Sequence, residues 1–353
     1  MISFYPGPSK VYEQVPQYVK DAYGKGILSI NHRSKSFMEL CAHAIRLLRS
    51  KLHVPEDYSI FFTSSATECW EIIAQSLVDV HSYHLYNGDF GQKWFDYTRK
   101  LKPSAIGYQF DQEQPLSISG QDLSTERGVI CITQNETSNG TRIKNPIIVK
   151  LRKKYPEHLI AVDATSSMAG VHLDFSQADV WFASVQKCFG LPAGLAVMIC
   201  SPAAMDTSKI LNENKHYNSL NFIAENMQKL QTPYTPNVMN IYLLMRVMEA
   251  AKPIATVEKK LSKRLKSYTD IIESSKKFSF HIKNKDVRSE TVLVIEGNPD
   301  DIDDLKEKAQ KTGIILGNGY GILKKNTFRI ANFPALKKRE VNILCEFLEG
   351  EIS

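Results

Sequence analysis

The chain has few cysteines, and none of them is placed for a metal cluster or a disulfide framework. The six cysteines lie at positions 41, 69, 131, 188, 200 and 345, and no two of them form a Cys-x-x-Cys pair. Zinc clusters and disulfide-stapled folds need closely spaced cysteines, so this spacing argues against both. We predict no metal site and reduced, mostly buried thiols in a cytoplasmic protein.

Long hydrophobic runs and concentrated positive charge are also missing. No window reaches the roughly 18 consecutive apolar residues that a membrane helix needs. The first residues, MISFYPGPSK, lack the basic start and apolar stretch of a signal peptide. The net charge of +6 is small for 353 residues, and no Lys/Arg block is long enough to follow a phosphate backbone. We therefore expect small-molecule substrates and neither a membrane nor a nucleic acid as a partner.

The first two thirds of the sequence alternate between short apolar runs and helix-length amphipathic segments. The composition, with 43% apolar and 23% charged residues, is that of an ordinary globular protein, and the length favours two domains. The apolar runs are continuous, which indicates strands buried on both faces of a mainly parallel sheet. These runs are YSIFFT, GVICIT, LIAVDAT, VWFASV and GLAVMIC, and FMELCAHAIRLLRSKL and NPIIVKLRKKY are helical stretches between them. The pattern predicts an α/β core.

Beyond residue 237 the pattern changes to long helices and then to a shorter α/β unit. NVMNIYLLMRVMEAA and TVEKKLSKRLKSYTDIIESS read as helices that bridge two domains. The remainder reads strand, helix, strand, strand, helix, from ETVLVIEG through IILGNGYG to KKREVNILCEFLEG. We expect this part to form a compact α/β sandwich of its own.

Chemically suggestive residues follow several of the predicted strands. Ligands of doubly wound sheets bind beyond the carboxyl ends of the strands, so these positions are candidates for a site. After IFF comes TSSATE, where small residues at a helix start suit an anion such as phosphate. The alternative for the same segment is an ordinary capping box of Ser65 with Glu68.

Asp163 and Lys187 stand at the ends of successive predicted strands and are expected to face one pocket. A buried carboxylate that pairs a pyridinium nitrogen, and a buried lysine that forms a Schiff base, are two requirements of a pyridoxal phosphate site. The helix start at TSSATE supplies a third, a cup for the phosphate. Phe90, after the turn in YNGDFGQKW, is a candidate ring for stacking, although rings at such positions are often only packing residues.

Nine segments in order resemble the phosphoserine aminotransferases, which are class V enzymes of the fold-type I pyridoxal phosphate group. The segments are YPGP, NHRSKSF, TSSATE, NGDFG, NETSNG, Asp163, QK (186–187), QTPYT and FRIANF, and they span nearly the whole chain. The resemblance implies a large cofactor-binding domain of residues 16–245 with a mainly parallel seven-stranded sheet. It also implies a small domain formed by residues 1–15 and 246–353, and a homodimer with shared active sites.

The resemblance also implies a role for each matching residue. Lys187 would form the Schiff base with pyridoxal 5'-phosphate, Asp163 would pair the pyridine nitrogen, Phe90 would stack on the ring, and Thr137 would bond the ring hydroxyl. The cofactor phosphate would be held by Ser65, Ala66, Thr67 and Gln186, with Gln231 and Thr232 from the other subunit. Arg329 would bind the substrate α-carboxylate, and His32 and Arg33 would meet its phosphate or side-chain carboxylate. The alternatives are an exposed strand residue for Arg329 and a basic turn for NHRS.

The sequence departs from the family pattern at two places. The position that carries an arginine for the substrate phosphate in some members is Ala66 here, and KCFGLPAG is one residue longer than the usual segment. The longer segment, together with NGDFGQKW, is similar to alanine-glyoxylate and serine-pyruvate aminotransferases of the same class. We predict a transaminase that converts 3-phosphohydroxypyruvate and glutamate to phosphoserine and 2-oxoglutarate. The alternatives are the alanine-glyoxylate type and, in another class, a non-catalytic binding protein of the same fold.

Overall fold

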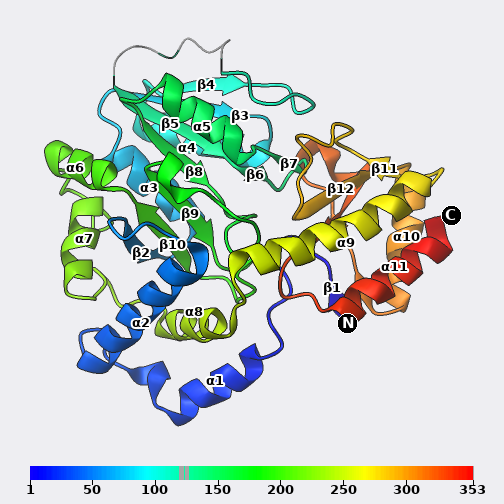
Figure 1. The fold of residues 1–353 in the computed structure, drawn as a ribbon, viewed down its shortest axis with the longest axis horizontal. Helices are drawn as coiled ribbons and strands as arrows, with labels where there is room; N and C mark the ends of the chain where they lie inside the picture. Colours follow the sequence, from blue (N-terminus) through cyan, green and yellow to red (C-terminus); the bar gives the residue numbers. More distant parts are fainter. Residues whose placement is uncertain (119–122, 124–126, 353) are drawn as a thin grey trace.

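The computed structural model describes residues 1–118, 123 and 127–352. A seven-stranded sheet forms its larger half (Figure 1), in the order β2-β10-β9-β8-β5-β3-β4. The strands are β2 (Ser59–Thr63), β3 (His81–Tyr86), β4 (Ile106–Gln109), β5 (Gly128–Thr133), β8 (Leu159–Asp163), β9 (Val180–Ser184) and β10 (Ala196–Cys200). Strand β10 runs antiparallel to both of its neighbours, and the other neighbours pair in parallel. The predicted mainly parallel sheet is confirmed.

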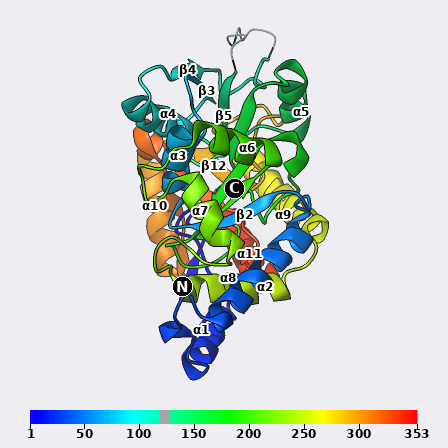
Figure 2. The ribbon, with the colours of Figure 1, turned by 90° about the vertical axis from the view of Figure 1, so that its left-hand side faces the viewer.

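The central strands are buried along their whole length, as their continuous apolar runs predict. Every residue of β8, β9 and β10 is buried. The helices of this half of the chain lie around the sheet, and α1 extends away from the rest in both views (Figures 1 and 2). These helices are α1 (Val15–Gly24), α2 (Lys35–Leu52), α3 (Ala66–Ser76), α4 (Asp89–Leu101), α5 (Asn145–Lys154), α6 (Pro202–Leu211), α7 (Leu220–Gln228) and α8 (Val238–Ala250).

A second, four-stranded antiparallel sheet forms the C-terminal part, in the order β11-β12-β15-β14. Its strands are β11 (Ser279–Phe280), β12 (Val292–Glu296), β14 (Gly317–Asn318) and β15 (Thr327–Ala331), and its helices are α9 (Ile254–Ser274), α10 (Pro299–Lys311) and α11 (Lys338–Ile352). The segment IILGNGYG is not the single strand we expected. It divides into β13 (Ile314–Ile315), which pairs in parallel with the N-terminal β1 (Ile2–Ser3), and β14, which pairs with β15.

Separate apolar cores support the two sheets. One cluster of buried residues extends from Val15 to Met248, and another joins Phe4 to residues between Tyr268 and Ile352. A small third cluster packs Cys188, next to Lys187, against Val292 and Val294 of the second sheet. The loop that carries Lys187 therefore lies where the two cores meet. Within the described ranges, no helix is long and apolar enough to cross a membrane.

Candidate functional site

A cavity of about 220 Å³ lies at the carboxyl ends of β5, β8 and β9 and at the start of α3. Its lining includes seven of the residues predicted from the sequence, namely Ala66, Thr67, Phe90, Thr137, Asp163, Gln186 and Lys187. The other lining residues are Gly7, Pro8, Trp70, Thr133, Asn135, Thr165, Ser166 and Ser184. Parallel strands end at one edge of the sheet, which explains why residues so far apart in the sequence meet here.

Lys187 is buried in this cavity, with only 7% of its surface exposed. Its Nζ donates hydrogen bonds to Thr137 Oγ1 at 2.6 Å and to Ser166 Oγ at 2.9 Å. Burial lowers the pKa of the amine from 10.5 to about 8; Asp163 and Glu136 oppose this shift, and Arg329 adds to it. The amine is thus much closer to its neutral, nucleophilic form than an exposed lysine is.

Asp163 is the last residue of β8 and points into the same cavity. Its Oδ2 accepts a hydrogen bond from Trp70 Nε1 at 3.3 Å, and its Oδ1 accepts one from the Thr165 amide at 2.9 Å. Burial raises the pKa of this carboxyl group, while Thr165, Lys187 and Trp70 oppose the shift. A buried carboxylate of this kind favours a cationic partner, such as a protonated ring nitrogen.

The start of α3 is both capped and open to an anion. Ser65 Oγ accepts from the Glu68 amide at 3.1 Å, so Ser65 is a helix cap, and Ser184 Oγ accepts from the Ala66 amide at 2.8 Å. The reciprocal half of the capping box is shifted by one residue, because Glu68 Oε2 accepts from the Ser64 amide instead. The hydrogen bonds among the described residues leave the Thr67 amide for a ligand at this positively polarised end.

Phe90 is the second residue of α4, not part of a free turn. Its ring stacks on Tyr320 with the ring centres 5.0 Å apart, and Lys187 Nζ lies 5.2 Å from the centre of the Phe90 ring. The aromatic ring is therefore supported by Tyr320 and lies beside the reactive amine. Tyr320 was not predicted, because it belongs to a loop of the C-terminal part.

The segments NGDFG and NETSNG, which contain Phe90 and Thr137, contact each other beside the cavity. Glu136 accepts from the Gly91 amide at 3.0 Å, and Ser138 Oγ accepts from the Asp89 amide at 3.0 Å. A Cβ on Gly88 would lie 2.4 Å from Glu136 Cγ, so this contact needs glycine. Glu136 is 1% exposed and was missed by the sequence analysis, although it lies next to Thr137.

Arg329, on β15 of the second sheet, lies outside the described lining of the cavity but contacts Thr137, which lines it. Its Nη1 donates to the backbone oxygen of Thr137 at 2.9 Å, and its Nε donates to the backbone oxygen of Asn318 at 2.6 Å. The residue is 4% exposed, so the alternative of an exposed strand residue is wrong. Burial lowers the pKa of the guanidinium, with Tyr5 the first of the groups that oppose the shift.

Like Ser65 and Arg329, the four remaining predicted residues lie outside the described lining of the cavity. Arg33 Nη1 donates to Gln231 Oε1 at 3.0 Å in an exposed contact, and Thr232 Oγ1 donates to the Tyr234 backbone oxygen at 2.6 Å. His32 packs the edge of its ring against Phe37, and burial lowers the pKa of the imidazole. Within one chain, these four residues form a separate group.

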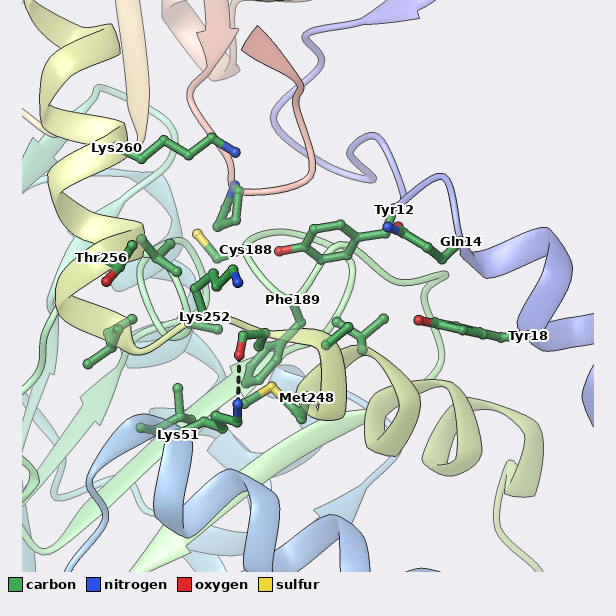
Figure 3. A pocket seen from close by; sticks show the side chains of 18 residues that line it. Tyr12, Gln14, Tyr18, Lys51, Cys188, Phe189, Met248, Lys252, Thr256 and Lys260 are labelled. Atoms are coloured by element: carbon green, nitrogen blue, oxygen red, sulfur yellow. Dashed lines mark hydrogen bonds between the residues drawn. The ribbon is translucent and has the colours of Figure 1, made fainter.

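The N-terminal segment forms backbone hydrogen bonds with the loop that carries Lys187. Ser9 N donates to the Gln186 backbone oxygen at 2.9 Å, and Tyr12 N donates to that of Gly190 at 3.0 Å. Gly190 has a φ of +63°, and a Cβ there would lie 2.7 Å from the Tyr12 ring. Figure 3 shows Tyr12 beside Cys188 and Phe189 in a second cavity of about 210 Å³. Its described lining shares no residue with that of the Lys187 cavity. It therefore lacks both Lys187 and Asp163, the two residues expected to react with or pair a cofactor.

The Lys187 cavity fits a polar cofactor with an aromatic ring. Thr133 Oγ1, Asn135 Nδ2 and Gln186 Oε1 are buried polar atoms that find no hydrogen-bond partner among the described residues, and all three residues line the cavity. Such atoms are costly unless a ligand pairs them. The reactive amine, the buried carboxylate, the open helix start and the ring of Phe90 match the groups of pyridoxal phosphate. Within the described residues, no cluster of His, Cys, Asp or Glu is suited to a metal ion.

Comparison with known proteins gives a consistent result. The family model described as "Aminotransferase class-V" matches residues 6–89 and 96–326. The crystal structure of a phosphoserine aminotransferase from Cytophaga hutchinsonii is similar with a TM-score of 0.95 and 34% identity, over 100% of this chain and 99% of that one. A phosphoserine aminotransferase of Rhodococcus opacus (strain B4) is 27% identical over 98% of this chain and 94% of its own. An alanine–glyoxylate aminotransferase from Nostoc sp. shares the fold, with a TM-score of 0.83, 19% identity, and coverage of 99% and 94% of the two chains.

Proposed function

The chain belongs to the class V aminotransferases, and we propose that within this family it forms phosphoserine from 3-phosphohydroxypyruvate, with glutamate as the amino donor. Membership makes it a pyridoxal phosphate-dependent transaminase of fold type I. The observation that carries the proposal is the pair of Lys187 and Asp163 in one buried cavity, in a chain 34% identical to a phosphoserine aminotransferase over its full length.

The cofactor would be held by residues of the cavity. Lys187 Nζ would attach it covalently, and Phe90 would cover one face of its ring. The Thr67 amide and hydroxyl, with Ser65, the Ala66 backbone and Gln186, would bind its phosphate. Support for this arrangement comes from the unpaired Gln186 Oε1 and from the open start of α3.

Two hydroxyls would guide the amine during the reaction. When bound, pyridoxal phosphate supplies an aldehyde for the substrate amine and a ring that accepts the electron pair of the broken Cα–H bond. Lys187, released from the cofactor, would move the proton as a general base and acid. Thr137 and Ser166 would orient Nζ, and Thr137 would exchange this contact for one to the ring hydroxyl. Asp163 would keep the ring nitrogen protonated.

Substrate anions would be bound by guanidinium groups. Arg329, already oriented by the Thr137 and Asn318 carbonyls, would bind the α-carboxylate. We further propose a cytoplasmic homodimer, in which His32 and Arg33 meet the substrate in the partner's site, and Gln231 and Thr232 its cofactor phosphate. Two observations support the dimer: α1 protrudes, with Tyr23 77% exposed, and none of these four residues belongs to the described lining of the chain's own cavity.

We also propose that the chain divides into a large domain of residues 16–245 and a small domain of residues 1–15 and 246–353. The two separate apolar cores support this division. The small domain would contribute Arg329 to the site.

A panel of amino donors tests the substrate. Single-turnover spectra of the purified enzyme with phosphoserine, glutamate, alanine and serine are expected to show fast conversion with the first two only. The alternative substrate class, alanine, serine or glyoxylate, rests on the extra residue in KCFGLPAG together with the segment NGDFGQKW. Fast conversion with alanine or serine and none with phosphoserine would establish that alternative.

A separate experiment tests the covalent attachment of the cofactor to Lys187. Borohydride reduction of the native enzyme is expected to fix the cofactor on the Lys187 peptide, and Lys187→Ala is expected to abolish this product. A protein that takes up no pyridoxal phosphate would refute the whole proposal.

A further inference from the structure

Glu136 is a fully buried carboxylate that bonds three donors of two different segments. Its Oε2 accepts from the Gly91 amide at 3.0 Å, and its Oε1 accepts from the Ser138 amide at 2.9 Å and from Ser138 Oγ at 2.7 Å. No ion pair within 4.0 Å includes it in the described part of the chain. A charged group buried without an ion pair is costly, so its retention needs a reason.

The first reason is that Glu136 caps the N-terminal end of α4. The residue at the N-cap is Gly88, which has no side chain, and Glu136 takes over the role of a cap by accepting from Gly91 in the first turn. Ser138 Oγ, itself bonded to Glu136, accepts from the Asp89 amide. Phe90 lies between these two amides, so the carboxylate helps to fix the backbone from which the ring projects.

The second reason is charge. Glu136 directly precedes Thr137, whose hydroxyl accepts from Lys187 Nζ and whose backbone oxygen accepts from Arg329 Nη1. Asp163, Glu136 and Cys188 act to raise the pKa of Lys187, and Arg329 acts to lower it. Glu136 in turn acts on Arg329, the other cation of the site. The carboxylate therefore places negative charge beside the two cationic side chains that the proposed reaction uses.

We propose that Glu136 is a positioning residue of the transamination site, which orients Phe90 against the cofactor ring and supplies negative charge beside Lys187. This inference rests on the proposed function, because it assigns Phe90 and Lys187 their roles. A carboxylate suits the place better than an amide, since both of its oxygens accept hydrogen bonds. A glutamine would turn an NH₂ group toward one of the backbone N–H donors.

Two substitutions of Glu136 distinguish the effect of its hydrogen-bond geometry from the effect of its negative charge. Glu136→Gln removes the charge and one acceptor, and Glu136→Asp keeps the charge but withdraws it by one methylene from Gly91. The matched control is Glu113→Gln, because the partly buried Glu113 also accepts from two backbone amides, those of Lys283 and Asn284, and does not line the cavity. Each protein is measured for the visible circular dichroism of its bound cofactor and for its cofactor dissociation constant. The pH midpoint of Lys187 acetylation is measured in the cofactor-free form.

Both Glu136 variants are expected to change the dichroism and to weaken cofactor binding by about tenfold, the effect of one lost hydrogen bond to a charged group. Only Glu136→Gln is expected to lower the labelling midpoint, by on the order of one pH unit. Variants whose dichroism and midpoint equal those of Glu113→Gln would overturn the inference. If the unsubstituted enzyme itself holds no cofactor on Lys187, the proposed function fails instead, so the two failures are distinguishable.

Discussion

Lys187 is expected to titrate far below an ordinary lysine in the cofactor-free protein. Burial lowers its pKa from 10.5 to about 8, against the opposing charges of Asp163 and Glu136. At pH 7 a lysine with the lower pKa is about 9% neutral, against about 0.03% at the ordinary value, a difference of about 300-fold. The neutral fraction rises with pH, so the reactivity of Lys187 is expected to increase from pH 6 and to level off above pH 9.

Competitive acetylation with acetic anhydride measures this titration. Trace labelling between pH 6 and pH 11, followed by mass analysis of the Lys187 peptide, gives the midpoint in the folded protein. The same peptide labelled in urea supplies the reference, because unfolding restores the solvent around the amine. Asp163→Asn removes the carboxylate that most strongly opposes the shift, so its midpoint is expected below that of the unsubstituted protein. A folded-state midpoint equal to that in urea would refute the assignment of Lys187 as a desolvated nucleophile.

The two remaining predictions concern the helices that border the site. Gly88→Ala is expected to destabilise the protein by about 1–3 kcal/mol in urea denaturation, because its Cβ would lie 2.4 Å from Glu136 Cγ. Gly24→Ala in α1, where a Cβ meets nothing within 4 Å, is the control, and an equal loss in both variants would contradict the steric reason. Ser65→Ala is expected to cost about 1 kcal/mol, since the Glu68 amide loses its cap, and unchanged stability would show that the cap contributes nothing.

Much of the large sheet was predictable because its strands are apolar without interruption. The segments at β2, β5, β8, β9 and β10 all lie where the sequence placed strands. The prediction that IILGNGYG forms one strand was wrong. Its first half pairs with β1 near the N-terminus, and its second half pairs with β15 near the C-terminus. Partner choice of this kind depends on distant segments, not on local composition.

Site residues that directly follow strands of the large sheet were predictable from the pattern of the sequence, whereas Arg329, on the second sheet, was named only through the family resemblance. Asp163 and Lys187 were predicted as site residues because each lies at or just after the end of a predicted strand. Trp70 was missed, although its position four residues after Ala66 puts both on one face of α3. Ser166 lies in a loop, and no periodic pattern marks it.

The mainly parallel sheet and the proximity of Asp163 to Lys187 could be predicted from the sequence, because continuous apolar runs indicate buried strands and parallel strands end at one edge of a sheet. Only the tertiary structure decided what completes the site. Arg329 bonds the backbone oxygen of Thr137, 192 residues away, and Glu136 bonds the Gly91 amide, 45 residues away. In both contacts the partner is a backbone group. Because every residue carries a backbone carbonyl and nearly every one an amide, the sequence does not indicate which of them a distant side chain will bond.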